Sequence, residues 1–402
     1  MAEKLTIGFL PLVDACLPIL ANEHGFATDE GLQLTFLRDV SWATVLDRLL
    51  YGHSDAAHLV APLAIATTLG RGRPAQQLAA PFVLGLNGNA ITLSPELAAR
   101  VCPGEGLGDP HTVGVALHEE VARLAGAGRK LRFGVVHRYS SHNYMLRYWL
   151  AACGIQPDRD VEIVTVAPPF SVDALEAGEI DGSCVGEPWN SIAVDRGAGR
   201  IVLATAQIWR RGVEKVLAMR ADRLEERRPA VEALIRAMRK AAAHFVDPAN
   251  WQDNAAILAR SEYCAAPPEI ILRAISDKLV LAAGHPPISY PDFMFQYREA
   301  ANFPWVSQAE WLYSQLVRWD GLGFDANDAT KAAQVFRPDV YRSALKGTGD
   351  VLPGANSKVE GSIDRLTPVT AQQGSITLSE NTFFDGVPFD PDGVEAYIAA
   401  QQ

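Results

Sequence analysis

One stretch of this sequence decides the fold class: Phe133-Gly-Val-Val-His137-Arg-Tyr-Ser-Ser141-His142-Asn-Tyr-Met-Leu-Arg147-Tyr-Trp-Leu150. The apolar run 131–136 has the length of a strand, and the apolar residues that follow Ser141 recur at helical spacing. Ser140 or Ser141 suits the N-cap of that helix. A strand that leads directly into a helix is the repeating unit of an α/β fold.

The same unit recurs through the first half of the chain. Apolar runs predict strands at 5–10, 32–37, 56–60, 83–86, 90–93, 131–136, 161–166, 182–185, 200–204 and 216–219. Helical patterns lie between them, at 15–24, 42–51, 62–69, 113–126, 142–153, 172–177 and 188–195. Beyond residue 220 the patterns are helical, with an apolar stripe from Leu224 to Phe245 and further helices near 254–260, 268–279, 308–319 and 327–345. We therefore expect an α/β protein with mixed, mostly parallel sheets, flanking helices and a helical C-terminal extension; residues 346–382 are expected to be irregular.

Composition narrows the class of protein. The 402 residues are 48% hydrophobic and carry a net charge of −11, which excludes nucleic acid and anionic membranes as bulk electrostatic partners. The 5 cysteines form no CxxC pair and are expected to be free thiols. No apolar run of membrane-spanning length occurs. The first strand begins within a few residues of Met1, without a basic and apolar leader, so we expect a cytoplasmic location.

His142 is the first candidate ligand-binding residue. It falls in the first turn of its predicted helix, where free backbone N–H groups and the positive end of the helix dipole favour an anion. The alternative is a solvated histidine near a helix cap. His53 and His58 lack a third metal ligand, so a buried core histidine is the better interpretation of His58, and no metal site is expected.

Four other segments place polar groups beside strand ends. Trp42 occupies the first turn of a helix and serves either as a core anchor or as an indole N–H donor to a small planar ligand. Gly88 and Asn89 interrupt an apolar strand, either as a plain turn or as a bend that faces a cleft. Glu187 follows a strand and either orients a donor or caps the helix that begins near Pro188. Lys215 precedes a short strand, where most lysines are exposed.

Taken together, these segments resemble the nitrate and bicarbonate substrate-binding proteins of the NrtA/CmpA type along nearly the whole chain. The resemblance rests on Ile7-Gly-Phe-Leu-Pro-Leu-Val-Asp14-Ala, Ser41-Trp-Ala, Asp55-Ala-Ala-His58-Leu-Val-Ala-Pro62, Asn87-Gly-Asn-Ala-Ile, His142 with Arg147-Tyr-Trp-Leu-Ala-Ala, Gly186-Glu-Pro-Trp-Asn, and Phe389-Asp-Pro with Glu395-Ala-Tyr397. It implies a two-lobed periplasmic-binding-protein-like fold of type II. It also implies a nitrate pocket between the lobes, lined by Trp42, residue 89, His142 and Lys215.

Two departures from the transport proteins refine this expectation. Asn89 stands where the resemblance implies glutamine, so its contact with the ligand is expected to be shorter or bridged by water. The leader, lipid-attachment cysteine and linker of the transport proteins do not occur, which favours the cytoplasmic branch of NasS-type nitrate and nitrite sensors. In that branch, the resemblance implies, the partner is an RNA-binding antiterminator of the NasT type, released when nitrate binds.

The chemistry of the implied residues agrees with nitrate, which is planar and accepts hydrogen bonds but donates none. Trp42, Asn89, His142, Lys215 and the backbone N–H of Gly88 or Asn89 make a set of donors, and we expect a pocket that offers donors only. We also count Glu187 among the candidate ligand-binding residues, because its carboxylate could orient one of these donors. The ammonium of Lys215 disfavours the bicarbonate branch, where a carboxylate serving a metal is implied at the equivalent place.

The protein would then act by closing its two lobes around the bound anion. We expect residues 1–86 and 207–402 to form one lobe and residues 87–206 the other, with no cofactor and no catalytic residue. Three alternatives stay open: the substrate-binding component of a nitrate ABC transporter whose signal peptide was removed, a bicarbonate binder, and an enzyme of the pyrimidine-forming thiamine-pathway type on the same fold. The last would require a cysteine cluster or a cofactor lysine in the cleft.

Overall fold

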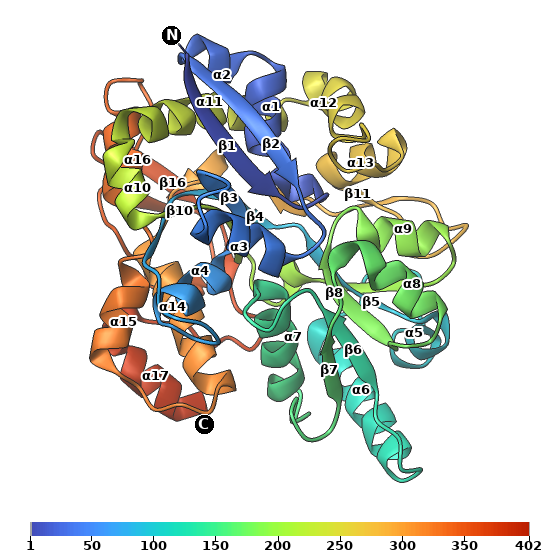
Figure 1. The fold of residues 1–402 in the computed structure, drawn as a ribbon. Coiled ribbons are helices and arrows are strands. Elements are labelled where there is room, and N and C mark those ends of the chain that lie inside the picture. The colour runs from blue at the N-terminus through green and yellow to red at the C-terminus, as the bar shows by residue number, and fades with distance from the viewer. Residues whose placement is uncertain (1, 402) are drawn as a thin grey trace.

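Two mixed sheets organise the chain, of which the computed structural model describes residues 2–401 (Figure 1). The six-stranded sheet has the order β13-β4-β10-β3-β1-β2 and consists of β1 (Glu3–Phe9), β2 (Leu32–Arg38), β3 (Ala56–Val60), β4 (Leu78–Asn87), β10 (Val213–Arg220) and β13 (Met294–Phe295). The five-stranded sheet has the order β7-β6-β8-β5-β9 and consists of β5 (Asn89–Leu93), β6 (Arg132–Val135), β7 (Glu162–Thr165), β8 (Gly182–Gly186) and β9 (Arg200–Ala204).

Helices cover both sheets, as the alternating pattern predicts. Those associated with the six-stranded sheet are α1 (Cys16–Glu23), α2 (Phe26–Asp29), α3 (Trp42–Leu50), α4 (Ala61–Thr68), α10 (Ala221–Glu226), α11 (Arg228–Val246), α12 (Trp251–Leu258), α13 (Pro268–Ile275) and α16 (Pro338–Leu345). Those associated with the five-stranded sheet are α5 (Pro95–Val101), α6 (Pro110–Ala125), α7 (Ser141–Ala152), α8 (Ser171–Glu176) and α9 (Trp189–Asp195). The predicted α/β class with flanking helices is confirmed.

Strand pairing is parallel for β1 with β2 and β3, and for β6 with β7 and β8. It is antiparallel for β10 with β3 and β4, for β13 with β4, and for β5 with β8 and β9. Antiparallel pairing is thus more extensive than the alternation of strands and helices suggested. Most of the antiparallel pairs in these two sheets involve β5 or β10, and each of these two strands begins just after the chain passes from one sheet to the other.

These two crossing segments lie side by side. One is the step from β4 to β5 through Gly88, and the other is the return from β9 to β10 through residues 205–212. The backbone N–H of Asn87 donates to the carbonyl of Gly212 at 2.9 Å, and the N–H of Gly212 donates to Oδ1 of Asn87 at 3.1 Å. Asn87 has a φ of 62°, a left-handed conformation that asparagine tolerates better than most residues. Hydrogen bonds between Asn87 and Gly212 therefore join the two crossings to one another.

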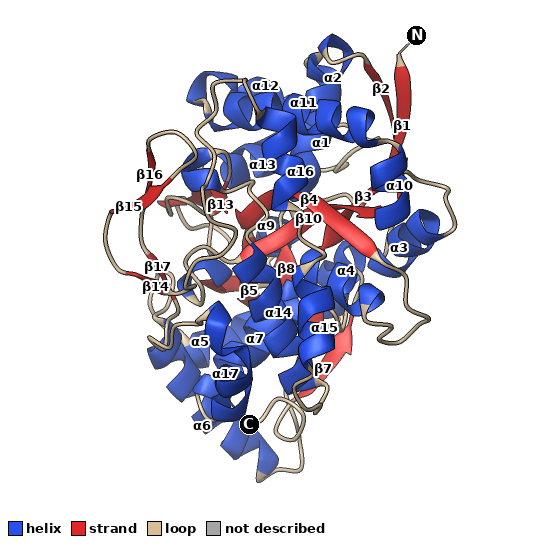
Figure 2. Cartoon of the chain, turned by 90° about the vertical axis from the view of Figure 1, so that its left-hand side faces the viewer, coloured by secondary structure: helices blue, strands red, loops and turns tan. Residues whose placement is uncertain are grey.

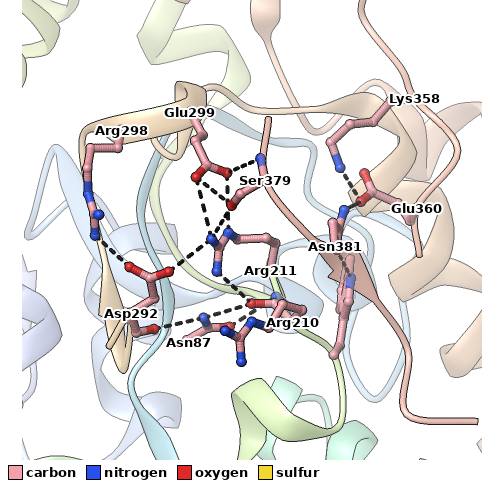
Figure 3. A network of polar contacts seen from close by, with 12 residues as sticks. Asn87, Arg210, Arg211, Asp292, Arg298, Glu299, Lys358, Glu360, Ser379 and Asn381 are labelled. Carbon is pink, nitrogen blue, oxygen red and sulfur yellow. Dashed lines mark hydrogen bonds and ion pairs between the residues drawn. The ribbon is translucent and has the colours of Figure 1, made fainter. Parts of the chain in front are cut away.

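A polar network fastens this junction to later parts of the chain (Figure 3). The amide of Asn87 donates to the carbonyls of Arg210 and Asp292, at 3.0 and 3.2 Å. The guanidinium of Arg211, which is buried, contacts Asp292 at 3.0 Å, Glu299 at 3.4 Å and the hydroxyl of Ser379 at 2.6 Å. Charge compensation on both sides allows this arginine to be buried.

The C-terminal extension contacts both halves of the molecule (Figure 2). It consists of α14 (Val306–Trp319), α15 (Ala326–Ala333) and α17 (Val394–Gln401). Helix α14 packs against α4, and its Trp311 ring lies 5.9 Å from the ring of Tyr148 in α7 and 4.6 Å from that of Trp209. Asp320, just after α14, accepts hydrogen bonds from Arg138 at 2.7 Å and Tyr139 at 3.2 Å.

Two expectations for the extension are wrong. The helix predicted over 327–345 is interrupted: α15 already ends at Ala333, and Pro338 begins the separate helix α16, where a proline suits the first position. The stretch 346–382, expected to be irregular, contains the pair β15 (Thr367–Thr370) and β16 (Ser375–Leu378), and the pair β14 (Ser362–Ile363) and β17 (Asn381–Thr382). A further short pair joins β11 (Lys278–Leu279) to β12 (Ile288–Ser289). Within residues 2–401, no helix has the length and apolarity needed to cross a bilayer.

Candidate functional site

Lys215 forms the centre of a charged cluster in the interior of the protein. Its side chain is 0% exposed, and its Nζ lies 2.6 Å from Oδ2 of Asp14 and 2.6 Å from Oε1 of Glu214. Burial opposes the charge of an ammonium, but the two carboxylates outweigh it and raise the pKa of Lys215. Lys215 is therefore a charged, fully buried lysine, and its predicted position before a strand is wrong, because β10 already begins at Val213.

Glu214 and Lys215 reach the same cluster although they are neighbours in one strand. Successive residues of a regular strand point to opposite faces. In β10, however, the pairing with β4 shifts register on both sides of Lys215, between Val213 and Lys215 and between Lys215 and Val216. An irregularity of this kind redirects side chains locally, which accounts for the contact between adjacent residues.

Asp14 joins a second buried pair to the cluster. It lies in the short 3₁₀ helix η1 (Val13–Ala15), and its Oδ1 is 2.8 Å from Nε2 of His58 in β3. Burial disfavours the charged carboxylate, but Lys215 and His58 outweigh it and lower the pKa of Asp14. Burial lowers the pKa of His58, an effect that Asp14 partly offsets. His58 is thus a buried core histidine with a partner, as expected from its place in a strand.

Trp42 closes one side of this pair. Ser41 caps α3, its side chain accepting from the N–H of Thr44 at 3.2 Å, so Trp42 stands at the first helical position. The indole ring lies 5.1 Å from the His58 ring, and Nζ of Lys215 lies 5.6 Å from the indole centroid. Its Nε1 is buried and finds no hydrogen-bond partner in residues 2–401. The ring packs as an anchor while its donor remains available.

His142 approaches the cluster from the five-stranded half. Ser140 is the N-cap of α7, accepting from the N–H of Asn143 at 3.1 Å, which confirms the predicted position of His142 in the first turn. The imidazole is fully buried, its Nδ1 is 3.3 Å from Oε1 of Glu214, and its Nε2 has no hydrogen-bond partner among the described residues. Burial and the Lys215 ammonium lower the pKa of His142 well below the usual imidazole value. The alternative of a solvated histidine is excluded.

Asn89 lies beside Asp14. A Cβ on Gly186, which pairs with Asn89 across β8 and β5, would lie 3.1 Å from Oδ1 of Asn89 and 3.5 Å from Oδ2 of Asp14. The Asn89 side chain is buried, and neither atom of its amide is hydrogen-bonded within the described part of the chain. Gly88 is needed for its backbone, since its φ is 85° and a Cβ there would meet Met294 at 3.3 Å.

Glu187 stands next to the cluster without contacting Lys215. Its Oε2 accepts from the N–H of Ser191 at 3.2 Å, so the carboxylate caps α9, and its carbonyl accepts from the N–H of Val13 at 2.9 Å. Burial, partly offset by Ser191, raises the pKa of Glu187 to about 7. Of the two predicted roles of the Glu187 side chain, the structure shows the one in which it caps a helix. The hydrogen bond from Val13 to the Glu187 carbonyl joins the end of β8 to the segment that carries Asp14.

The expectation of a pocket that offers only donors is wrong in one respect. Asp14 and Glu214 bring acceptors into the site, because a fully buried ammonium requires counter-charges. Sequence reasoning missed both residues as part of the site. Asp14 lies in the turn beyond the carboxyl end of β1, and polar residues beyond the carboxyl ends of strands gather at ligand clefts in open α/β sheets, so that position was a usable signal. Nothing in the local sequence indicated the irregularity at Glu214.

The cluster combines donors without partners and two carboxylates that are already paired. Trp42 Nε1 and Asn89 Nδ2 are buried donors, and His142 Nε2 is a buried ring nitrogen that donates in one tautomer. Residues 2–401 use the hydrogen-bonding capacity of none of the three, and an unmet buried polar group costs free energy. Two of the three N–H groups of Lys215 are directed to carboxylates, which leaves a third. The described residues contain no group of three or more His, Cys, Asp or Glu side chains placed to hold a metal ion. The arrangement suits a small acceptor.

Sequence comparison places the chain among known proteins. The model of the NMT1-like family matches residues 2–259. The nitrate/nitrite binding protein NrtA of Synechococcus elongatus is 30% identical over 404 residues, a match that covers 98% of this chain and 85% of that protein. The nitrate import ATP-binding protein NrtC of Synechocystis is 33% identical over 350 residues, covering 86% of this chain and 50% of that protein. The chain spans about half the length of NrtC-type relatives.

Structural comparison agrees. The crystal structure of the periplasmic nitrate-binding protein NrtA from Synechocystis matches with a TM-score of 0.86 and 26% identity, covering 100% of this chain and 99% of the other. A ligand-binding component of an ABC-type import system from Staphylococcus aureus, with a TM-score of 0.62 and 16% identity over 85% of this chain and 99% of that one, shares the fold. The predicted periplasmic-binding-protein-like fold is confirmed by these matches.

Proposed function

The chain belongs to the NMT1-like family, in a group that includes NrtA-type binding proteins, and on this basis we propose that it binds nitrate or nitrite between its two sheets without catalysing a reaction. One observation carries the proposal. Unpartnered buried donors on Trp42, Asn89 and His142 surround a charged lysine, and they come from α3, β5 and α7. Donors from both halves of the molecule can be satisfied together only by a small acceptor held between them.

Nitrate fits this set because it accepts hydrogen bonds through three oxygens and donates none. Lys215 supplies the positive charge, and the proposed contacts are its third N–H, the indole of Trp42, the amide of Asn89 and Nε2 of His142. Gly88 would add a backbone N–H. One charge-assisted and several neutral hydrogen bonds are sufficient for micromolar affinity, about −8 kcal/mol. Nitrite has the same charge and fewer acceptors, so it is the proposed second ligand.

Lys215 also argues against the bicarbonate alternative, although a bicarbonate transport ATP-binding protein, CmpC of Synechococcus elongatus, is 30% identical over 98% of this chain and 54% of its own length. An ammonium already held by two carboxylates leaves no place for the cation that a carboxylate-lined bicarbonate site would use. Lys215 is held as a charged ammonium by two carboxylates, so it lacks the neutral amine that a cofactor lysine would need, which gives no support to a thiamine-pathway enzyme.

The role that the relatives favour is delivery of the anion to an ABC transporter. NrtA is named as a binding protein, and NrtC as an import ATP-binding protein, so a binding component of nitrate import is our first proposal. Closure of a predicted lobe formed by residues 87–206 onto the remainder would enclose the anion. In such a system the permease distinguishes the closed from the open arrangement.

A cytoplasmic sensor that holds a NasT-type RNA-binding antiterminator and releases it when nitrate binds is our second proposal. A sensor would use the same anion site as a transport protein, but its open and closed arrangements would be distinguished by the antiterminator and not by a permease. Nitrate and partner need to prefer different arrangements by only about 1–3 kcal/mol. Gel filtration of the protein with a purified NasT-type regulator, with and without nitrate, separates the proposals: a complex that nitrate dissociates supports the sensor, and no complex in either condition supports transport.

Isothermal titration tests anion binding itself. The purified protein is titrated with nitrate, nitrite, bicarbonate and sulfate in a chloride-containing buffer. We expect saturable binding of nitrate in the micromolar range, weaker binding of nitrite, and no heat with bicarbonate or sulfate. The matched control is the exposed lysine variant Lys240→Met, which should bind as the wild type does. Binding of bicarbonate but not nitrate would overturn the ligand assignment.

A further inference from the structure

His142 has an acceptor on one side of its ring. Nδ1 lies 3.3 Å from Oε1 of Glu214, an oxygen that is also 2.6 Å from Nζ of Lys215. Neither ring nitrogen is hydrogen-bonded within residues 2–401, so the contact of Nδ1 with Glu214 is one of distance alone, and in the proposed function Nε2 donates to the bound anion. Once the anion is bound, the imidazole therefore stands between a carboxylate and nitrate.

Neither of these two neighbours can donate a hydrogen bond. A neutral imidazole carries one N–H, so one ring nitrogen donates and the other presents a lone pair. If Nδ1 carries the hydrogen, the lone pair of Nε2 meets a nitrate oxygen. If Nε2 carries it, the lone pair of Nδ1 meets the Glu214 carboxylate. Each tautomer thus leaves one repulsive contact in a buried site, where unmet polar groups are costly.

A single additional proton removes both conflicts. An imidazolium donates through both nitrogens, and a protonated Glu214 donates to Nδ1 while Nε2–H donates to the anion. We propose that the site takes up one proton with each anion it binds, and that the pair formed by His142 and Glu214 holds it. This inference rests on the proposed anion-binding function and deepens it.

The charges around the pair support the same conclusion. Facing it are Lys215 on the same strand as Glu214, Asp14 on η1, His58 on β3 and Cys184 on β8. With neutral histidines and a neutral thiol, two carboxylates and one ammonium leave one net negative charge. Nitrate would add a second negative charge to this buried group, and one proton restores the original balance.

The other titratable neighbours do not require the proton. His58 can donate through Nε2 to Asp14 at 2.8 Å as a neutral ring, so this pair needs no added proton. Burial raises the pKa of Cys184, which keeps the thiol neutral near neutral pH. Burial and Lys215 lower the pKa of His142, so the ring carries no extra proton in the anion-free protein, and a negative charge placed beside Nε2 would act in the opposite direction and favour protonation.

The test is titration of the wild-type protein with sodium nitrate near neutral pH in two buffers, phosphate and Tris, whose ionisation enthalpies differ strongly. We expect the observed binding enthalpies to differ by that buffer difference multiplied by about one proton taken up. We also expect the affinity to fall about tenfold for each pH unit above neutral. Nitrate binding with equal enthalpies in both buffers would overturn the inference and leave the proposed function standing. Absence of binding in both buffers, also one pH unit below neutral, would overturn both.

Two variants locate the proton. In Glu214→Gln the amide can donate to Nδ1 of His142, so a neutral ring can donate Nε2–H to nitrate; we expect binding with proton uptake close to zero and little dependence on pH. His58→Gln is the matched control, and whatever its affinity it should retain uptake of about one proton. Unchanged uptake in Glu214→Gln, or lost uptake in His58→Gln, would assign the proton to another group. If Glu214→Gln does not fold, His142→Gln, which can donate and accept without titrating, should bind nitrate without proton uptake.

Discussion

Replacing Lys215 by methionine removes the charge at the centre of the cluster and keeps most of the side-chain volume. In the wild type, Nζ is 2.6 Å from each of two carboxylates, on Asp14 and Glu214, and the side chain is 0% exposed. Hydrogen bonds to charged groups contribute about 1.5–3 kcal/mol each, and removal of one partner from a buried ion pair costs about 3–5 kcal/mol. We expect Lys215→Met to lower the free energy of unfolding by about 3–5 kcal/mol.

The same variant should lose nitrate binding. One charge-assisted hydrogen bond of about 1.5–3 kcal/mol corresponds to about 10- to 150-fold in affinity, and two uncompensated carboxylates would repel the anion further. Urea denaturation measures the stability and isothermal titration the affinity. The matched control is Lys240→Met, whose lysine is 48% exposed and pairs with Glu30 at 2.7 Å; an exposed pair contributes at most about 1 kcal/mol.

A second substitution separates charge from packing. Lys215→Met combined with Glu214→Gln removes one of the stranded carboxylates, so it should be more stable than Lys215→Met alone. A Lys215→Met protein as stable as the Lys240→Met control, or one that binds nitrate within threefold of the wild type, would refute the assignment of Lys215 as a buried, charge-compensated anion ligand.

The other predictions concern three positions. Trp42→Phe retains a ring beside His58 but lacks the indole N–H, so nitrate affinity measured by titration should fall about 3- to 10-fold with little loss of stability; unchanged affinity would show that the indole does not contact the anion. Asn87→Ala removes three side-chain hydrogen bonds and leaves alanine at a φ of 62°, so urea denaturation should show a free energy of unfolding about 2–4 kcal/mol lower than that of the wild type. Asn87→Gly should lose less, because glycine accepts this φ. A free energy of unfolding within about 0.5 kcal/mol of the wild-type value would show that these hydrogen bonds do not stabilise the junction of the two crossings. Burial raises the pKa of Glu187 to about 7, above its unfolded value of 4.5, so its contribution to stability is present below about pH 4.5 and is lost as the pH rises through 7. Glu187→Gln should therefore remove this loss, about 3 kcal/mol at 1.36 kcal/mol per pKa unit, and equal pH profiles of the two proteins would contradict the raised pKa.

The C-terminal extension bears on how an anion could be enclosed. It contacts α4 on one side and Tyr148 of α7 on the other, so it bridges the two sheets beside the crossing segments. Any rearrangement between the two halves must change these contacts or pivot about them. The predicted division at residues 86–87 and 206–207 places its boundaries at the two crossings, and it remains a proposal that only a second arrangement of the chain would test.

Much of the architecture could be predicted from local patterns. Helices α3 and α7 begin where Ser41 and Ser140 cap them, and the apolar spacing that follows specifies which face is buried. The positions of Trp42 and His142 in first turns after strands followed from the same patterns. Capping and periodicity depend on residues within one or two turns of each other, so a sequence displays them directly.

The environment of Lys215 could not be predicted in this way. Asp14 and Lys215 lie far apart in the sequence and meet only because β1, β3 and β10 are neighbours in one sheet. Glu214 joins them where the pairing of β10 with β4 departs from regular register. The sequence by itself determined the elements and the donors at their ends, whereas only the tertiary structure decided which charges face one another. The physical reason is that capping and periodicity are local, while compensation of a buried charge depends on whichever groups packing brings within a few ångströms.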